Sequence, residues 1–336
     1  MMFTDRKANS RDSSRAKQPW PAGKDFKVLS IDGGGIRGIY PAVFLQETED
    51  RCGSIRDHFD LVAGTSTGGI IAIGIGLGLS VKSIAELYCV QGQQVFPPRW
   101  YDRKAARFFR KLFRPSHDHK ALEAALKAAF QERLLGESGS RLVIPAFVGP
   151  NPQITVFKTD HHPDYRRDWQ SPAWEVARAT SAAPTFFAGH ASEKAFFLDG
   201  GVWANNPVMC AVVEALSTYE IGPEQIRVLS LGTGNVAQRL KERALRAGVI
   251  GWRGIINTAM YLTTDSALSQ AQLILGHHRI VRVEPPQEVG AIELDDWRTA
   301  NELLPPLARQ ASRDLQGELA NFFDANVAVR ERHYSG

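Results

Sequence analysis

A serine between two glycines is the first candidate for chemistry in this sequence. The motif GTSTG (residues 64–68) follows a short apolar run and precedes a stretch of small, apolar residues. A serine on a sharp strand-to-helix turn needs small neighbours two residues away on either side, because the backbone is crowded there. Such a turn raises the hydroxyl above a sheet edge, at a helix N-terminus that favours developing negative charge. Ser66 is therefore the candidate nucleophile, with Gly64 and Gly68 as its nucleophile elbow.

A second glycine-rich loop, DGGGIRG (residues 32–38), lies earlier in the chain. Its G-x-G-x-x-G spacing also occurs in loops that bind a pyrophosphate, and this interpretation stays open as the alternative. A dinucleotide fold needs an acid at the tip of the next strand, whereas Glu49 and Asp50 fall at the end of a predicted helix. Acyl transfer from a serine instead needs N–H donors around an oxyanion. The predicted oxyanion hole, with a supporting cation, comprises Gly33, Gly34, Gly35 and Arg37.

The serine also needs a base. None of the nine histidines lies in a glycine-rich turn at a strand end. Asp199, in FFLDGG, closes an apolar run, and the two glycines after it make a tight turn that leaves its carboxylate at the sheet edge. Burial beside a serine would raise its pKa enough for it to accept a proton. The same residue could instead cap the following turn, and spacing alone leaves both roles open.

These loops need a sheet to position them. Apolar runs predict strands at residues 26–31, 58–63, 153–159, 195–199, 227–231 and 279–284. Helical patterns predict helices at residues 39–50, 70–79, 83–93, 171–178, 208–219, 252–275 and 307–328. Because strands and helices alternate, we expect an α/β fold with helices on both faces of the sheet.

Composition bounds the class of protein. The chain has 336 residues, of which 43% are hydrophobic and 23% charged, as in ordinary globular proteins. We expect a polar, disordered tail at residues 1–25, a catalytic domain at 26–290 and a helical extension packed on it at 291–336. The three scattered cysteines favour a reducing compartment. With no signal peptide and no run long enough to span a bilayer, we expect a soluble, cytoplasmic protein.

Positive charge is concentrated in two segments. The net charge is +4, yet the chain outside residues 1–25 and 99–114 is net negative, which argues against a nucleic-acid partner. In residues 96–114 (FPPRWYDRKAARFFRKLFR), a helix from Ala105 onward would place aromatic side chains along one side and cations around the other. This pattern is typical of an interfacial helix on an anionic membrane. A helix packed on the domain, with solvated cations, is the alternative.

The three glycine-containing motifs resemble the signature blocks of the patatin-like phospholipases. Three further stretches are similar to that family: KTD at residues 158–160, ATSAAPTFF at 179–187 and LSLGTG at 229–234. The resemblance implies a three-layer α/β/α sandwich with a central, mostly parallel sheet. It also implies a Ser–Asp dyad without histidine, in which Ser66 is the nucleophile and Asp199 the base. The implied activity is hydrolysis of acyl esters of membrane lipids, with no metal or other cofactor.

The stretches IDGGGIRGIYPAVFL and FDLVAGTSTGGIIAIGIGLGL are similar to a bacterial branch of this family. Its members are anti-phage (CBASS) effectors switched on by a cyclic nucleotide, which implies a cyclic dinucleotide partner and, when active, a location on the inner membrane. Basic and aromatic groups for such a ligand, or for a solvated strand edge, are His277, His278, Arg279 and Arg282. An acyltransferase or thioesterase with the same dyad stays open, as does a non-catalytic, nucleotide-binding regulatory protein.

Overall fold

The computed structural model describes residues 15–96, 119–183, 189–192, 195–234 and 255–335. Its sheet contains β1 (Phe26–Ile31), β2 (Leu61–Gly64), β3 (Arg141–Gly149), β4 (Gln153–Lys158), β5 (His190–Ala191), β6 (Phe196–Asp199), β7 (Ile226–Leu231) and β8 (Ile280–Val283). The helices around it are α1 (Ile39–Cys52), α2 (Thr67–Gly76), α3 (Val81–Cys89), α4 (Gly92–Val95), α6 (His119–Phe130), α7 (Ala173–Thr180), α8 (Gly201–Ala204), α9 (Val208–Thr218), α11 (Ile255–Leu275), α12 (Trp297–Asp314) and α13 (Gln316–Phe323).

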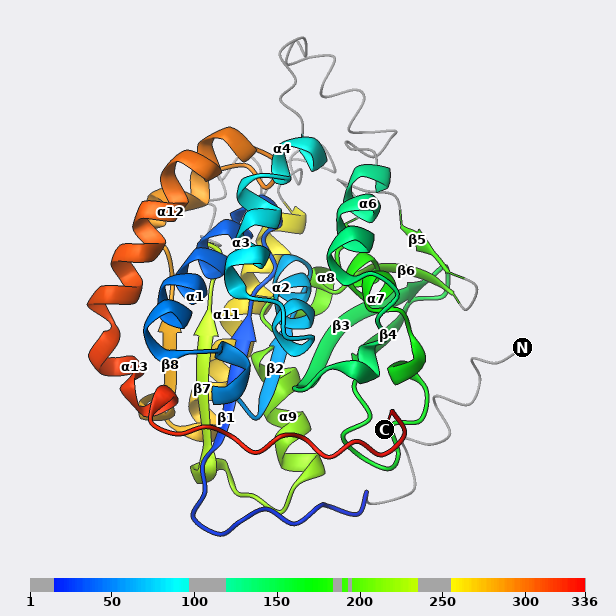
Figure 1. Ribbon diagram of the computed structural model, residues 1–336, viewed down its shortest axis with the longest axis vertical. Helices are drawn as coiled ribbons and strands as arrows, with labels where there is room; N and C mark the ends of the chain where they lie inside the picture. The colour runs from blue at the N-terminus through cyan, green and yellow to red at the C-terminus, as the bar shows by residue number, and fades with distance from the viewer. Residues whose placement is uncertain (1–14, 97–118, 184–188, 193–194, 235–254, 336) are drawn as a thin grey trace, which may run out of the picture.

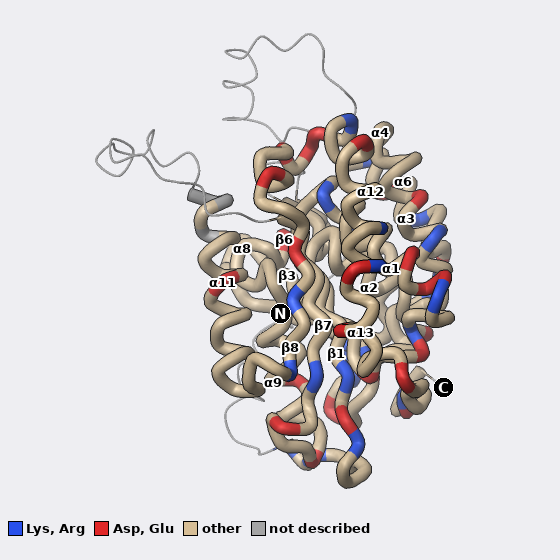
Figure 2. The backbone as a smooth tube through the Cα atoms, turned by 90° about the vertical axis from the view of Figure 1, so that its left-hand side faces the viewer, with Lys and Arg blue, Asp and Glu red and all other residues tan. Residues whose placement is uncertain are grey.

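The sheet separates two hydrophobic cores. On β1, Phe26 and Val28 belong to the core under α9 and α11, whereas Leu29 and Ile31 belong to the core under α1, α2 and α3. This alternation is the two-residue period of a strand that is buried on both faces. Figure 2 shows the resulting layers from the side, with α8, α9 and α11 on one side of the strands and α1 and α2 on the other. The predicted three-layer α/β/α sandwich is confirmed.

The central strands are parallel, and β3 is the point where the pairing changes. The pairs β1–β2, β1–β7, β2–β3 and β7–β8 are parallel, whereas β4 and β6 both run antiparallel to β3. Val143 of β3 pairs with β2 and with β4, and Ala146 pairs with β6 and with β4. A strand has two edges, so β2 and β6 share the edge of β3 that β4 does not occupy. They run toward each other along it, and their C-terminal ends meet.

Strand β3 was missed in the sequence because Pro145 interrupts its apolar run, and proline argues against a central strand. The structure explains how it is tolerated. On the edge of β3 that β2 and β6 share, the pairing with β2 ends at Val143 and the pairing with β6 begins at Ala146. Pro145 therefore lies at the gap between the two strands. Its carbonyl oxygen accepts a hydrogen bond from the Thr180 hydroxyl (2.6 Å) and therefore points away from β4. The N and C=O of one residue point to the same edge, so the missing N–H also faces this gap.

The predicted C-terminal helix at residues 307–328 is wrong in its bounds. Helix α12 begins at Trp297, runs through Pro305 and Pro306, and is followed by a separate α13. Proline is costly inside a helix, so the sequence pattern favoured a start after Pro305 and Pro306. Instead, the carboxylate of Asp296 caps α12 by accepting the Thr299 N–H (3.2 Å), and the helix packs on α1.

After α13, residues 324–335 form a non-helical strap that runs past the N-terminal ends of the central strands (Figure 1). Arg330 is buried, and its guanidinium donates to Asp160 (2.8 Å). Asp160 also accepts the backbone N–H groups of Tyr334 and Ser335, both at 2.7 Å. Although burial opposes its charge, these bonds and Arg330 lower the pKa of Asp160. Asp160, the acid of the KTD motif, thus holds the strap in place through these bonds.

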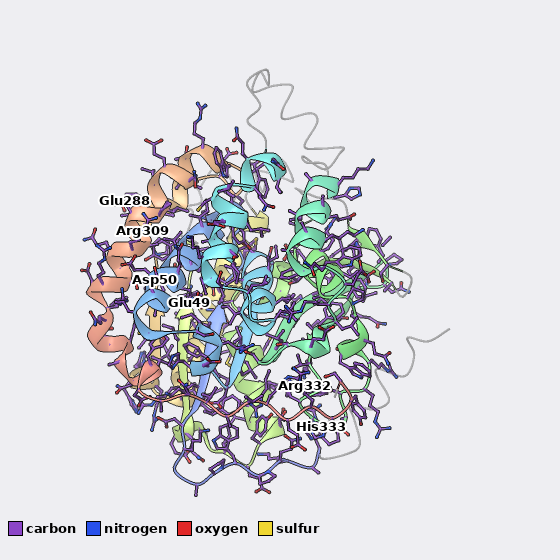
Figure 3. All side chains as sticks on the ribbon, viewed as in Figure 1. Glu49, Asp50, Glu288, Arg309, Arg332 and His333 are labelled. Carbon is purple, nitrogen blue, oxygen red and sulfur yellow. The ribbon has the colours of Figure 1, made fainter. Side chains whose placement is uncertain are left out.

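The predicted disorder does not hold for residues 15–25, whereas residues 1–14 lie outside the described residues. The backbone of Gln18 bonds to Thr218 and Glu220, and its side chain contacts His333 (2.9 Å) on the strap, labelled in Figure 3. Trp20 packs against Phe26, with ring centroids 4.8 Å apart. The bonds of Gln18 and the packing of Trp20 together hold this segment on the domain. Within the described residues, no helix is both long and apolar enough to cross a bilayer.

Candidate active site

The nucleophile elbow lies between β2 and α2. Ser66 has φ 55° and ψ −121°, a left-handed conformation that is rare for a residue with a side chain. A Cβ at Gly64 would lie 2.1 Å from the carbonyl oxygen of Gly68, and one at Gly68 would lie 2.2 Å from that of Ile31. Only glycine fits at either position, which is the crowding expected from the motif.

The Ser66 hydroxyl donates to Asp199 Oδ2 across 2.7 Å, and both side chains are buried. Asp199 Oδ1 accepts the backbone N–H of Gly201 (2.6 Å), which fixes the orientation of the carboxylate. Burial raises the pKa of Asp199 to about 6, although its two hydrogen bonds and nearby Arg178 act in the opposite direction. A carboxylate with this pKa is ionised at neutral pH and is a better proton acceptor than an exposed aspartate.

The glycine loop lies directly beside the serine. A Cβ at Gly33 would be 3.3 Å from Ser66 Cβ. The Gly33 amide, however, donates to the carbonyl oxygen of Asn205 (2.9 Å), so it is not available to an oxyanion as the sequence predicts. Within the described part of the chain, the N–H groups of Gly34 and Gly35 have no acceptor. These two amides can therefore bind a negatively charged oxygen.

Comparison with known proteins shows the family to which the chain belongs. The model of the family described as "Patatin-like phospholipase" matches residues 29–212. The chain belongs to the patatin-like phospholipase family. It is 32% identical to a cGAMP-activated phospholipase of Pseudomonas aeruginosa, covering 73% of this chain and 75% of the relative. It is also 32% identical to Patatin-like protein 2 of Arabidopsis thaliana, covering 74% of this chain and 68% of the relative.

Among solved structures, VipD of Legionella pneumophila aligns with 94% of this chain and 81% of its own, at 14% identity and a TM-score of 0.38.

Membership in the patatin-like family assigns the chain to the lipid ester hydrolases. Family membership favours the oxyanion interpretation of the glycine loop over the pyrophosphate interpretation. In agreement, Glu49 stays on α1 (Figure 3), where its carboxylate accepts the Val81 N–H (2.7 Å).

Arg37 lies beside the glycine loop of the patatin-like domain. It is buried, and its guanidinium donates to the carbonyl oxygen of Gly234 (2.7 Å), just after β7. Burial lowers the pKa of Arg37 to about 10, with nearby Glu284 acting in the opposite direction, so the group stays charged at neutral pH. Arg37 thus ties the glycine loop to the neighbouring strand end.

An ion-pair network holds the start of the loop. The guanidinium of Arg282 donates to both oxygens of Asp32, at 3.0 and 2.6 Å, and also contacts Glu284. Although burial acts against its charge, the two carboxylates raise the pKa of Arg282. Arg279 in turn donates to Asp25 (3.0 Å). Of the four residues expected to offer groups to a nucleotide, these two arginines are already engaged.

No histidine in the described chain is hydrogen-bonded to Ser66 or Asp199. His161, for example, bonds to Thr159 and Glu214 away from the site, and burial lowers its pKa to about 4. Within the same residues, no group of three or more His, Cys, Asp or Glu side chains is arranged to hold a metal ion.

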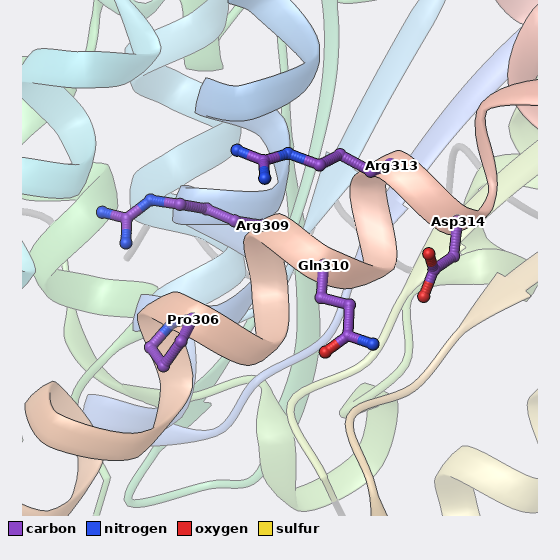
Figure 4. A pocket seen from close by; sticks show the side chains of 5 residues that line it. All are labelled: Pro306, Arg309, Gln310, Arg313 and Asp314. Atoms are coloured by element: carbon purple, nitrogen blue, oxygen red, sulfur yellow. The ribbon is translucent and has the colours of Figure 1, made fainter.

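An open pocket of about 420 Å³ lies along α12 and is lined by Pro306, Arg309, Gln310, Arg313 and Asp314 (Figure 4). It shares no residue with the dyad or the glycine loop.

The sequence interpretation missed three residues that hold the site together. Leu294 accepts the Ile36 N–H on its carbonyl oxygen (2.9 Å) and lies against Gly35. Asn205 accepts the Gly33 amide, as described, and Thr180 bonds to the backbone of Ser66. Two of these contacts use backbone carbonyls, which any residue type supplies, so no sequence signal marks them. Thr180 alone lies in a motif, the ATSAAPTFF stretch.

Proposed function

We propose that this patatin-like phospholipase cleaves acyl esters of membrane glycerophospholipids through Ser66 and Asp199. The observation that carries the proposal is the 2.7 Å hydrogen bond between a strained elbow serine and a buried carboxylate. Asp199 takes the hydroxyl proton while Ser66 Oγ forms a bond to the acyl carbonyl carbon. The ester C–O bond then breaks, and the leaving glycerol oxygen takes the proton from Asp199. The product of this half-reaction is an acyl-serine.

Water completes the cycle by the same route. Asp199 accepts a proton from water while the hydroxide attacks the acyl-serine, and Ser66 regains its proton as the fatty acid leaves. In both steps, the carbonyl oxygen carries negative charge, and the Gly34 and Gly35 amides stabilise it by donating hydrogen bonds. The sign of the α2 dipole also favours this charge, since Ser66 precedes the first turn of that helix.

The experiment that tests this function combines a serine-reactive phosphonate with a lipid assay. We expect the phosphonate to label Ser66, and purified protein to release free fatty acid from phospholipid vesicles. Transfer of the acyl group to an added alcohol in preference to water would instead indicate the acyltransferase. Absence of labelling would favour the regulatory, nucleotide-binding protein. A lipid profile of cells that express the wild type beside Ser66→Ala would identify the lipid class.

The pH dependence should report the pKa of Asp199. Because the protonated carboxyl cannot act as a base, kcat/KM on a soluble ester should fall about tenfold per pH unit below about pH 6. Unfolding should not cause this loss. The pKa of Asp199 is higher in the folded protein than in the unfolded chain, so its protonation favours the fold. Circular dichroism at pH 5 checks this point, and a flat profile down to pH 4.5 would exclude Asp199 as the base.

Membrane contact through residues 96–114 is a further part of the proposal, although nearly all of this segment lies outside the described residues. Cations that dock on anionic lipid act through screened surface charge, so vesicle binding should weaken as salt rises. Replacement of five basic residues by Gln should lower activity on vesicles at least about tenfold more than on a soluble short-chain ester. Equal loss on both substrates would indicate a packing role. The residues are Arg103, Lys104, Arg107, Arg110 and Lys111.

A cyclic dinucleotide is the proposed activator. The support comes from relatives of similar length that are named cGAMP-activated phospholipases, in Pseudomonas aeruginosa and other bacteria. A phospholipase inside the cell endangers the membrane of its own host, which is a physical reason for such control. The described structure leaves few of the expected basic groups near β8 for the ligand, because Arg279 and Arg282 are held in ion pairs. His277 and His278 are exposed.

A further inference from the structure

The strand ends that carry the dyad are not joined to each other directly. Along β3, the pairing with β2 ends at Val143 and the pairing with β6 begins at Ala146. This leaves a gap opposite Pro145. The side chain of Thr180, the last residue of α7, connects the segment that follows β2 to β3 at this gap. Its hydroxyl oxygen accepts the backbone N–H of Ser66 (3.0 Å), and its hydrogen is donated to the Pro145 carbonyl oxygen (2.6 Å).

The same segment also holds the second member of the dyad. Two residues after Thr180, the carbonyl oxygen of Ala182 accepts the backbone N–H of Asp199 (3.1 Å). Thr180 and Ala182 are fully buried, so neither bond can be exchanged for one to bulk water. The backbones of Ser66 and Asp199 are therefore both fastened to one three-residue segment. The Thr180 methyl group additionally packs against Gly69, in the first turn of α2.

We propose that Thr180 is a positioning residue for the reaction: its hydroxyl fixes the Ser66 backbone to β3 and so sets the Ser66–Asp199 distance. This inference rests on the proposed function of the dyad. It gives the ATSAAPTFF stretch a physical role, because Thr180 takes the place of the strand neighbour that Pro145 lacks. Ser66 needs this support because its backbone is in the left-handed region, which side-chain-bearing residues do not hold without external contacts.

The test substitutes the hydroxyl while it keeps the shape of the side chain. Thr180→Val leaves the Ser66 N–H and the Pro145 carbonyl without partners, and we expect kcat on a soluble ester to fall about 30-fold. KM should change less than about threefold, because the substrate does not touch Thr180. Thr180→Ser keeps the hydroxyl and should retain kcat within about threefold. The rate of phosphonate labelling at Ser66 should follow kcat across these variants.

A second pair of variants covers the case in which Thr180→Val fails to fold. Thr180→Cys and Thr180→Ser differ in one atom, and sulfur is the weaker acceptor, so the cysteine variant should be about tenfold slower than the serine variant. The matched control is Thr159→Val. Thr159 is equally buried and also accepts a backbone N–H on β3, that of Leu142 (3.1 Å), but it has no bond to the dyad. It should lower the melting temperature and leave kcat unchanged.

The outcomes distinguish failure of the proposed function of the dyad from failure of the positioning role of Thr180. If the wild type is labelled at Ser66 neither alone nor with a panel of cyclic di- and trinucleotides, the proposed function itself fails, whatever the Thr180 variants do. If the wild type is labelled, the positioning role is overturned by a Thr180→Val variant with wild-type kcat. It is equally overturned if Thr180→Ser is as slow as Thr180→Val, or if Thr159→Val lowers kcat by the same factor as Thr180→Val.

Discussion

Ser66→Ala and Asp199→Asn should each lower ester hydrolysis by about 10⁴-fold while the protein stays folded. The first substitution removes the nucleophile. The second keeps the size of the side chain and most of its hydrogen bonds, yet an amide cannot accept the hydroxyl proton. Because the two residues act as one unit, the double variant should be about as slow as either single variant. Initial rates on a soluble ester and on vesicles measure the effect.

The matched control for Asp199→Asn is Asp160→Asn. Asp160 is also a buried carboxylate that accepts backbone N–H groups, but it latches the C-terminal strap. Loss of its charge leaves Arg330 buried without a counter-ion, so the melting temperature should fall while kcat per folded molecule is kept. A near-normal rate for Asp199→Asn, together with loss of activity in a histidine variant, would replace the proposed dyad by a histidine-containing triad.

Addition of the correct cyclic dinucleotide should raise vesicle hydrolysis by about 100-fold. A shift from about 1% to 99% active protein requires roughly 5.5 kcal/mol of differential binding between the two states, which a ligand with several phosphate and base contacts can supply. The measurement is fatty acid release by purified protein with a panel of cyclic di- and trinucleotides. Ser66→Ala, which should bind the nucleotide without hydrolysis, separates binding from catalysis.

Two results would contradict nucleotide control. One is full activity in the absence of any nucleotide. The other is lack of activity with every nucleotide tested while the phosphonate still labels Ser66. Arg282 variants do not serve to locate the activator site, because Arg282 forms an ion pair with Asp32 at the start of the glycine loop. Their loss of activity would have a structural cause. His277→Ala and His278→Ala are the cleaner probes, since both side chains are exposed.

The sequence predicted what depends on local chemistry. Glycines at positions 64 and 68 are the only residues that fit the elbow, and the run of apolar residues before each motif marks a buried strand. The long-range pairing could not be predicted. Strand β3, which brings Ser66 and Asp199 together, was hidden by Pro145, whose tolerance depends on the gap between β2 and β6. The occupation of the Gly33 amide by a distant carbonyl left no trace in the sequence either.

The distance in sequence between the parts of the site has a consequence for synthesis of the protein. Ser66 and Asp199 are 133 residues apart, and Leu294, which holds the glycine loop through Ile36, comes much later still. A nascent polypeptide leaves the ribosome from its N-terminus, so the nucleophile emerges long before its base and before the segment that braces its oxyanion loop. Unfinished chains therefore carry an exposed but inert serine. Translation products that stop before Asp199 lack the base of the proposed dyad, and those that stop before Leu294 lack the carbonyl that holds Ile36.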